Sequence, residues 1–287
     1  MSEFPDMSGS YEIEAPAKTN LWLKILGKRE DGFHEIDTRM VSLSLVDRLR
    51  LKWREDDQVV LRCSDESLPT GNENLCVKAV RALESKTGKV FAVSIDLEKN
   101  IPSGAGLGGG SSDAAAVLQA LNEMAGLELS KDELAGVGAE IGSDVPFFVY
   151  GQACDCRGRG EKVVPVSDEV PSFSVLLVKP AFGISAASAY QKFSGSSEYE
   201  GFSYTPQKRA WGEMVNHLER PVFEKFPILG GMKNWLLEQP GVDAALLSGS
   251  GSTLLAVLKS EAAGQSLIPM IEERYGENCW TYVGRTA

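Results

Sequence analysis

A glycine-rich segment that leads into a helix is the part of this sequence best suited to chemistry. Residues 101–115 read IPSGAGLGGGSSDAA, and an apolar run typical of a helix follows. The glycines let the backbone turn tightly, and Ser111, Ser112 and Asp113 are residue types that favour a helix start. Amides that converge at a helix N-terminus attract anions, because unpaired donors and the positive end of the helix dipole point the same way. The segment predicts a site for a phosphate chain, and hence a nucleotide-using enzyme.

The same glycines also match a dinucleotide-binding fingerprint, which would make the chain an oxidoreductase. Gly104, Gly106 and Gly109 fit the pattern G-x-G-x-x-G, but that pattern requires a second parallel strand after the helix. Residues 129–134 carry a second helix start instead. The sequence has no Gly-Lys-Ser/Thr after the glycines and no His-Arg-Asp or Asp-Phe-Gly motif, which argues against a Walker A loop and a protein kinase. A tight turn whose glycines serve only packing is the remaining alternative.

Hydrophobic periodicity predicts the elements that position this loop. Strands are expected at 11–15, 20–26, 40–53, 58–62, 90–97, 174–178, 244–247, 253–258 and 279–283. Helices are expected at 72–88, 112–125, 131–141, 185–193, 208–219, 227–238 and 261–274, with a short strand or apolar turn at 145–150. Strands and helices are interleaved without strict βαβ alternation, so the predicted fold class is α+β.

Composition limits the possible functions. The chain has 287 residues and a net charge of −11, which argues against nucleic acid or an anionic membrane as its main partner. No apolar run approaches the length of a membrane span, and the first ten residues lack signal-peptide character. Five cysteines at no metal-like spacing fit a reducing compartment, so a cytoplasmic location and no protein-bound metal are expected. The sequence leaves open whether the chain is a monomer or a homodimer.

The chain divides into two expected lobes. Residues 1–10 are expected to be disordered, and a Pro-containing acidic stretch at 163–172 resembles a linker. We place an N-terminal lobe at 11–165 and a C-terminal lobe at 166–287.

Three separated segments together resemble the motifs of the GHMP small-molecule kinases, named for galacto-, homoserine, mevalonate and phosphomevalonate kinases. They are PAKTNL at 16–21 with DGFHE at 31–35, the glycine segment from Pro102 to Ala115, and SGSG at 248–251. The segments GSDVPFF at 142–148 and RGRGE at 157–161 narrow the resemblance to the branch that acts on 4-diphosphocytidyl-2-C-methyl-D-erythritol. The chain departs from the family at Phe33, where Tyr is usual, at Ser143, where Ala is usual, and at Cys154-Asp155-Cys156.

The resemblance implies a two-lobed kinase fold with the active site in the cleft between the lobes. The implied activity is ATP-dependent phosphorylation of the 2-hydroxyl of that alcohol, in the non-mevalonate isoprenoid precursor pathway. Asp144 would be the base that orients the hydroxyl and accepts its proton, and Lys18 would keep this carboxylate ionised and stabilise the developing charge. The lobe at 11–165 would bind ATP, and the lobe at 166–287 would lie on the substrate side.

The resemblance also assigns binding residues. ATP phosphates would lie on the glycine segment, namely Pro102, Ser103, Gly104, Ala105, Gly106, Leu107, Gly108, Gly109, Gly110, Ser111 and Ser112. Asn20 shares a strand face with Lys18 and would contact the substrate. Phe33 and His34 would offer the cytosine a ring face and a hydrogen-bonding edge, with Tyr190 as a second aromatic residue. The turn at Ser248, Gly249, Ser250 and Gly251 would close over phosphates, although it could equally be a plain hairpin turn.

The implied cofactor is ATP as phosphoryl donor. Mg²⁺ is expected to arrive with ATP, held by phosphates and water with at most one protein oxygen. Another GHMP kinase with a simpler alcohol is the main alternative, but only a nucleotide-tailed substrate requires a base-stacking pair such as Phe33 and His34. A protein that binds without catalysing is a weaker alternative, because Lys18 and Asp144 are both present. The sequence leaves the roles of Arg157 and Arg159 open.

Overall fold

The computed structural model describes residues 9–166, 170–209 and 211–287. Its strands are β1 (Tyr11–Lys28), β2 (His34–Trp53), β3 (Val59–Cys63), β4 (Val93–Glu98), β5 (Cys154–Gly158), β6 (Lys162–Pro165), β7 (Ser174–Lys179), β8 (Gln207–Arg209), β9 (Gly212–Asn216), β10 (Val242–Leu247), β11 (Leu254–Leu258) and β12 (Trp280–Arg285). Its helices are α1 (Leu75–Thr87), α2 (Gly109–Met124), α3 (Lys131–Ile141), α4 (Val145–Tyr150), α5 (Ala186–Phe193), α6 (Glu219–Lys225), α7 (Pro227–Leu237) and α8 (Glu261–Tyr275). No helix in these ranges is long and apolar enough to cross a membrane.

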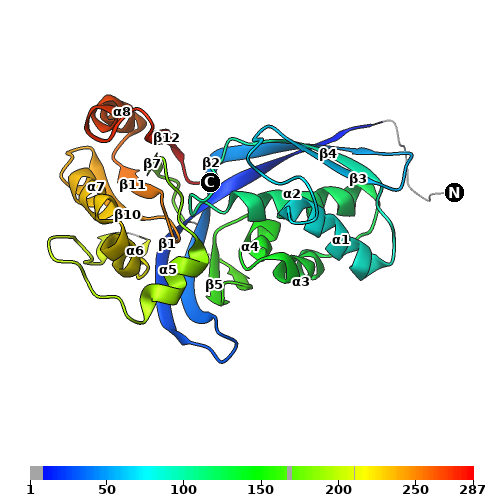
Figure 1. Ribbon diagram of the computed structural model, residues 1–287, viewed down its shortest axis with the longest axis horizontal. Helices are drawn as coiled ribbons and strands as arrows, with labels where there is room; N and C mark the ends of the chain where they lie inside the picture. The colour runs from blue at the N-terminus through cyan, green and yellow to red at the C-terminus, as the bar shows by residue number, and fades with distance from the viewer. Residues whose placement is uncertain (1–8, 167–169, 210) are drawn as a thin grey trace.

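A long antiparallel hairpin of β1 and β2 forms the centre of the larger sheet. This sheet has eight strands in the order β3-β4-β2-β1-β9-β8, with β5 paired to β2 and β6 paired to β5. The hairpin pairs Tyr11 with Leu51 at one end and Lys28 with His34 at the other. It therefore reaches from the helices α1 to α4 to the smaller sheet (Figure 1).

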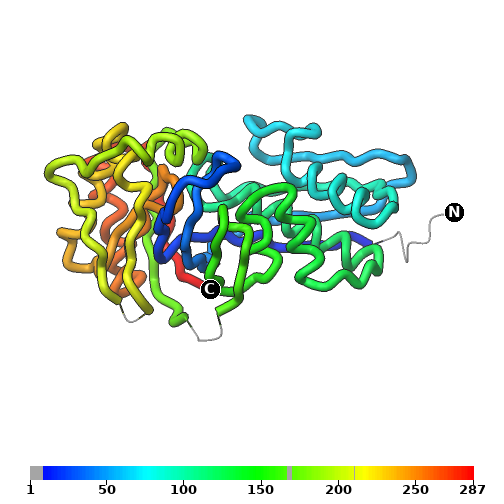
Figure 2. The backbone as a smooth tube through the Cα atoms, turned by 90° about the horizontal axis from the view of Figure 1, so that it is seen from below, coloured from blue at the N-terminus to red at the C-terminus, as the bar shows by residue number. Residues whose placement is uncertain are grey.

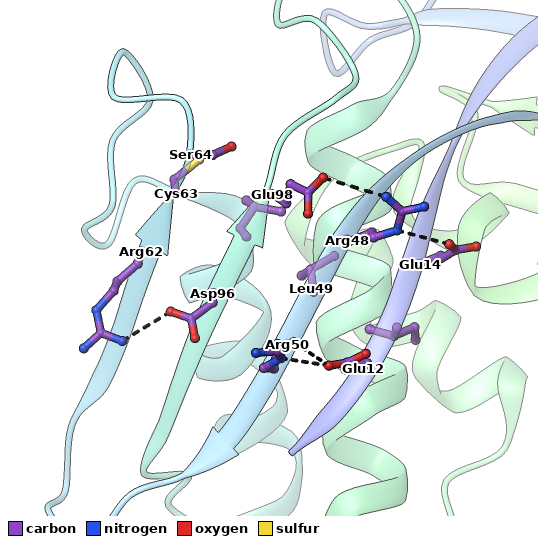
Figure 3. Close-up of a pocket in the computed structure, with 12 residues that line it drawn as sticks. Glu12, Glu14, Arg48, Leu49, Arg50, Arg62, Cys63, Ser64, Asp96 and Glu98 are labelled. Carbon is purple, nitrogen blue, oxygen red and sulfur yellow. Dashed lines mark hydrogen bonds and ion pairs between the residues drawn. The ribbon is translucent and has the colours of Figure 1, made fainter.

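The two faces of the larger sheet differ because side chains alternate along a strand. Inward-facing residues such as Leu49, Leu51, Ile95 and Leu97 pack with the alanine-rich helix α2 and its neighbours in one core. The intervening residues of the same strands form exposed ion pairs on the opposite face (Figure 3), namely Arg48 with Glu14 and Glu98, Arg50 with Glu12, and Arg62 with Asp96. Exposed pairs of this kind contribute little to stability. Their charged side chains make this face of the sheet polar and open to solvent.

The smaller sheet forms the second lobe. Its order is β10-β11-β7-β12, all antiparallel, and its residues pack with α6, α7 and α8 in a separate core. The tube in Figure 2 has this lobe at one end and the helices α1 to α4 at the other. The C-terminal strand returns to the long hairpin, where Thr286 forms a bridge with Leu43. The predicted α+β fold class, with two lobes, is confirmed.

The second half of the chain also contributes to the larger sheet. Strand β9 runs parallel to β1, with Trp22 opposite Val215 and Leu23 opposite Asn216. The predicted linker at 163–172 overlaps β6, and residues 167–169 within it lie outside the described residues. The boundary between 165 and 166 therefore stays a proposal. Most of the expected disordered N-terminus, residues 1–8, also lies outside the described residues.

Two predicted elements are wrong. Residues 145–150 form the helix α4, which begins after Asp144, has Pro146 in its first turn and ends at Gly151 with φ of 68°. A short buried apolar run has no periodicity that separates a strand from a helix. The predicted helix at 208–219 is replaced by β8, β9 and the start of α6, because pairing with the edge of β1 overrides local helical spacing.

Candidate active site

One cavity of about 1090 Å³ lies where the two lobes meet, and most of the predicted site residues line it. Its wall combines the strands β1 and β2, the glycine segment, Asp144, the helix α5 and the turn after β10. The lining residues among the predictions are Lys18, Asn20, Phe33, His34, Pro102, Ser103, Gly104, Ala105, Gly106, Leu107, Gly108, Gly109, Gly110, Ser111, Asp144, Tyr190, Gly249 and Ser250. Ser112, Ser248 and Gly251 are buried beside the cavity and do not line it.

The glycine segment forms a tight loop that ends as the first turn of α2. The helix begins at Gly109, and its N-cap is Gly108 with φ of 74° and no side-chain cap. The prediction that Ser111, Ser112 and Asp113 cap the helix is therefore wrong, because all three lie inside its first turns. The first amides of a helix have no intrahelical acceptor, so these N–H groups are available to an anion at the cavity wall.

Gly106 lies where a side chain could not fit. Its φ is 76°, and a Cβ atom there would lie 2.2 Å from the carbonyl oxygen of Ser248. The hydroxyl of Ser248 donates to the carbonyl oxygen of Gly106 at 3.2 Å. The glycine loop and the turn between β10 and β11 are therefore in direct contact across the two lobes.

Lys18 and Asp144 form an ion pair beside this loop. The Nζ of Lys18 lies 3.4 Å from Oδ2 of Asp144, and it donates to Oδ1 of Asn20 at 3.0 Å. The Lys18 side chain is 5% exposed and that of Asp144 is 35% exposed, so the carboxylate remains open to the cavity. The backbone N–H of Lys18 also donates to the carbonyl of Leu107 at 2.9 Å, which ties the strand that carries Lys18 to the glycine loop.

Asn20 is held in a fixed orientation on the same strand face as Lys18. Its Nδ2 donates to Oγ1 of Thr38 at 2.7 Å, so its Oδ1 faces the lysine. Irregularities in the β1–β2 register flank these positions, between Pro16 and Lys18 and between Asn20 and Trp22. Such bulges re-aim side chains at the edge of a site.

A group of aromatic residues lies at the far end of the cavity. The rings of His34 and Tyr190 are stacked with centroids 5.7 Å apart, and Phe33 is 49% exposed. The Nε2 atom of His34 is buried and has no hydrogen-bond partner among the described residues. Burial, and then the charge of Lys28, lower the pKa of His34, so its imidazole is neutral near pH 7. A neutral, unpartnered ring nitrogen is suited to the polar edge of a planar ligand.

Arg159 and Arg157, whose roles the sequence left open, differ in position. The guanidinium of Arg159 lies 5.1 Å from the ring centroid of Phe33 and donates to the carbonyl of Ala139. Arg159 lines the cavity, whereas Arg157 is exposed on β5 and does not.

Sequence reasoning missed a buried charge cluster below the glycine loop. Lys99 lies between Asp47 and Asp113, with a close contact to Asp47 and 2.7 Å to Oδ2 of Asp113. Asp47 also accepts from the backbone N–H groups of Asn100 and Ile101. The cluster thus fixes the entry of the loop and the first turns of α2. Lys99, three residues before Pro102, was the only sequence signal for this cluster. Its carboxylate partners, Asp47 and Asp113, lie elsewhere in the sequence.

Replacing Asp113 by Asn is expected to change how stability depends on pH. Burial raises the pKa of Asp113 to about 7, although Lys99 opposes the shift, and the neighbouring Asp47 adds to it. Because the folded-state pKa exceeds the unfolded value, the stabilising contribution is full below about pH 4 and is lost as pH rises through about 7. We expect wild-type stability to fall over this range by up to about 1.4 kcal/mol per pH unit more steeply than that of Asp113→Asn.

Urea unfolding at pH 5, 6, 7 and 8 measures this difference. Asp96→Asn, which removes an exposed pair with Arg62, is the control for general loss of negative charge. Equal slopes for wild type and Asp113→Asn would contradict the assignment.

No group of three or more His, Cys, Asp or Glu residues suited to a metal ion occurs within residues 9–166, 170–209 and 211–287. All five cysteines are free thiols. The hydroxyl of Ser111 lies at the cavity wall in the first turn of α2, where an oxygen donor could meet a nucleotide-bound ion.

Comparison with known proteins finds the two domains of the GHMP kinases in this chain. The family described as GHMP kinases N terminal domain matches residues 74–152, and GHMP kinases C terminal matches residues 206–277. A 4-diphosphocytidyl-2-C-methyl-D-erythritol kinase from Syntrophotalea carbinolica is 38% identical over 266 residues, covering 91% of this chain and 94% of that protein. A protein of the same name from Bacillus pumilus is 37% identical, covering 88% of this chain and 90% of its own length.

Solved structures agree with these relatives. A crystal structure of 4-(cytidine 5'-diphospho)-2C-methyl-D-erythritol kinase has a TM-score of 0.79 at 30% identity and covers 96% of this chain and 99% of that chain. A homoserine kinase from Cytophaga hutchinsonii has a TM-score of 0.71 at 17% identity, covers 100% of this chain and 97% of that chain, and is similar in fold.

Proposed function

Since this chain belongs to the GHMP kinase family, and within it to the 4-diphosphocytidyl-2-C-methyl-D-erythritol kinases, we propose that it phosphorylates the 2-hydroxyl of that alcohol with ATP. This reaction belongs to the non-mevalonate isoprenoid precursor pathway. The observation that carries the residue assignment is the Lys18–Asp144 pair, which lies beside the glycine loop in a cavity shared by both lobes. The free thiols fit the cytoplasm as its location.

The chemistry requires one proton acceptor and one positive charge at the reacting centre. The 2-hydroxyl oxygen attacks the γ-phosphorus, the bond from that phosphorus to the bridging oxygen of the β-phosphate breaks, and ADP leaves. The hydroxyl proton passes to Asp144, whose carboxylate is open to the cavity. Lys18 stabilises the charge that develops on the transferred group, and Asn20 orients the substrate.

ATP binding is assigned to the glycine loop. Amides from Gly109 to Ser111 face the cavity at the start of α2 and would hold the phosphates. Beyond the loop, the cavity wall includes Leu68, Pro69 and Leu75, an apolar surface suited to the adenine ring. Mg²⁺ would enter on the phosphates and neutralise their charge, and Ser111, which lines the cavity in the first turn of α2, could offer it one oxygen. The dinucleotide alternative is not supported, because α2 is followed by α3 rather than by a strand parallel to β4.

The cytosine end of the substrate is assigned to the aromatic group. His34 offers an unpartnered Nε2, and Tyr190 and Phe33 line the same part of the cavity. In the structure Tyr190 packs directly on His34, so the two rings together form one part of the cavity wall. Lys28 and Arg159 add positive charge beside Phe33, where the substrate's phosphates would pass.

Replacing His34 by Ala is expected to raise KM for the diphosphocytidyl alcohol. The loss of a hydrogen bond to a buried polar edge costs about 1–3 kcal/mol, which corresponds to roughly fivefold to about 150-fold in KM. KM for ATP should change little and serves as the internal control. Wild type should discriminate against an analogue that carries uracil in place of cytosine, and the variant should do so less. A change in KM for ATP alone, or no change in either, would refute the cytosine assignment.

ADP release tests the substrate directly. A coupled assay should give rapid ADP formation with 4-diphosphocytidyl-2-C-methyl-D-erythritol and only background rates with mevalonate and homoserine. Equal or faster turnover of a simple alcohol would favour another GHMP kinase activity over the one proposed.

A further inference from the structure

Asn216 is a buried polar residue outside the cavity, and it lies between strand β1 and the turn that follows β10. It is the last residue of β9 and is 2% exposed. It pairs with Leu23 of β1, three residues beyond Asn20 on the same strand. Neither the glycine loop nor the proposed substrate pocket includes it.

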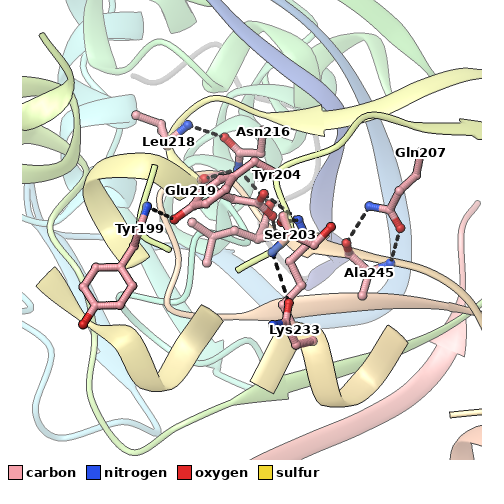
Figure 4. Close-up of polar contacts among 12 residues, drawn as sticks. Tyr199, Ser203, Tyr204, Gln207, Asn216, Leu218, Glu219, Lys233 and Ala245 are labelled. Carbon is pink, nitrogen blue, oxygen red and sulfur yellow. Dashed lines mark hydrogen bonds and ion pairs between the residues drawn. The ribbon is translucent and has the colours of Figure 1, made fainter. Parts of the chain in front are cut away.

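Its side-chain hydrogen bonds go to backbone groups, one at the end of β10, one in the turn after β10 and one just before α6. Nδ2 of Asn216 donates to the carbonyl of Leu247 at 2.8 Å and to that of Gly249 at 2.7 Å. Oδ1 accepts from the N–H of Leu218 at 2.9 Å (Figure 4). The opposite amide orientation would place an oxygen against two carbonyl oxygens, so the partners fix the assignment.

The second of these bonds reaches a residue of the cavity wall. Gly249 has φ of 54°, and a Cβ atom there would lie 3.3 Å from Nζ of Lys18 and 3.6 Å from Oδ1 of Asn20. The backbone of the turn therefore lies directly against the proposed catalytic lysine. A small displacement of Gly249 would move the wall that confines Lys18 and its partner Asp144.

A second residue, Glu219, holds the end of β10 but forms no side-chain hydrogen bond with the backbone of Gly249 in the turn. Oε1 of Glu219 accepts from the N–H of Leu247, and its other oxygen pairs with the buried Lys233 (Figure 4). The first contact holds the end of β10, before the turn, and the second ties Glu219 to α7. Among the described residues, Asn216 is the only one whose side chain forms a hydrogen bond with the backbone of Gly249.

We propose that Asn216 is a positioning residue that holds the Ser248–Gly251 turn against Lys18 and so sets the rate of phosphoryl transfer more than substrate affinity. This inference rests on the proposed function, because Lys18 must act at the reacting centre. Misplacement of a wall of an active site by about 1 Å can cost up to about a hundredfold in rate.

A matched pair of variants tests the inference. Gln207 exchanges two hydrogen bonds with the backbone of Ala245, two residues before Leu247 on the same strand, but does not reach the turn. Asn216→Ala is expected to lower kcat about tenfold or more, with KM for ATP and for the alcohol changed less than about threefold. Gln207→Ala is expected to keep kcat near wild type, although it also loses two part-buried hydrogen bonds. Asn216→Ser, which makes a smaller change in the same place, should lie between wild type and Asn216→Ala.

Thermal unfolding of each variant separates positioning from stability. The inference is upheld if folded Asn216 variants lose kcat while Gln207→Ala, at a similar Tm, does not. It is overturned if both variants match Gln207→Ala in kcat, if their loss appears in KM alone, or if neither Asn216 variant folds. An inactive wild type would instead reject the proposed function, and this inference with it.

Discussion

Asp144→Asn is expected to bind both substrates and to turn over at least about 10² more slowly than wild type. A positioned general base contributes about 10²- to 10⁴-fold, and an amide cannot accept the hydroxyl proton. The substitution preserves the size of the side chain at the start of α4, so the helix and the cavity should remain intact. It also removes the charge that faces Lys18 at 3.4 Å, which adds to the loss at the reacting centre.

Steady-state kinetics with both substrates and a nucleotide-binding titration measure this result. Asp155→Asn is the matched control, because Asp155 lies on β5, pairs with Arg39 of the adjacent strand β2 and does not line the cavity. It should leave kcat within about twofold of wild type, since neither Asp155 nor Arg39 lines the cavity and surface pairs act on stability. A near-wild-type kcat for Asp144→Asn would remove this carboxylate from the mechanism.

Gly106→Val is expected to weaken ATP binding more than about tenfold. A β-branched residue resists the positive φ of this position, and its Cβ would collide with the backbone of Ser248. The glycine loop and the opposing turn must then separate, which moves the amides that hold the phosphates. Affinity for the diphosphocytidyl alcohol should be affected less, because its base is assigned to the aromatic group around His34 rather than to the glycine loop.

Gly126→Val is the control that separates the effect of backbone strain at a positive φ from the effect of a steric collision. Gly126 also has a positive φ, of 55°, but a Cβ there meets nothing within 4 Å. Both variants should lose some stability, whereas only Gly106→Val should lose nucleotide affinity in an isothermal titration. A folded Gly106→Val protein that binds ATP as wild type does would show that the loop does not hold the phosphates.

The parts of the fold that sequence predicted well are those with strong local signals. Helix α3 begins after Ser130, whose side chain and that of Glu133 cap the helix reciprocally, and the predicted span 131–141 is confirmed. Helix α7 and the strands of the smaller sheet were also located from local patterns. Residues 207–216 failed because their structure depends on pairing with β1, almost two hundred residues earlier in the chain.

The site was predictable only where one segment carries its own chemistry. The glycine loop indicated a phosphate site from its residues alone, but Asp144 gained its role only from the family resemblance. The partners of Lys99 and Asn216 come from other strands and helices, and a single sequence does not reveal such contacts.

Phosphorus NMR of the purified product is the most direct test of the central claim. Carbon 2 of the methylerythritol carries a methyl group and no hydrogen. A phosphate transferred there therefore gives a phosphomonoester signal without three-bond coupling to a proton. We predict one such singlet, in an amount equal to the ADP formed, and the diphosphate signals of the substrate should be retained. A signal split by protons, which places the phosphate on the primary or secondary hydroxyl, or ADP formation without a new ester, would contradict the account.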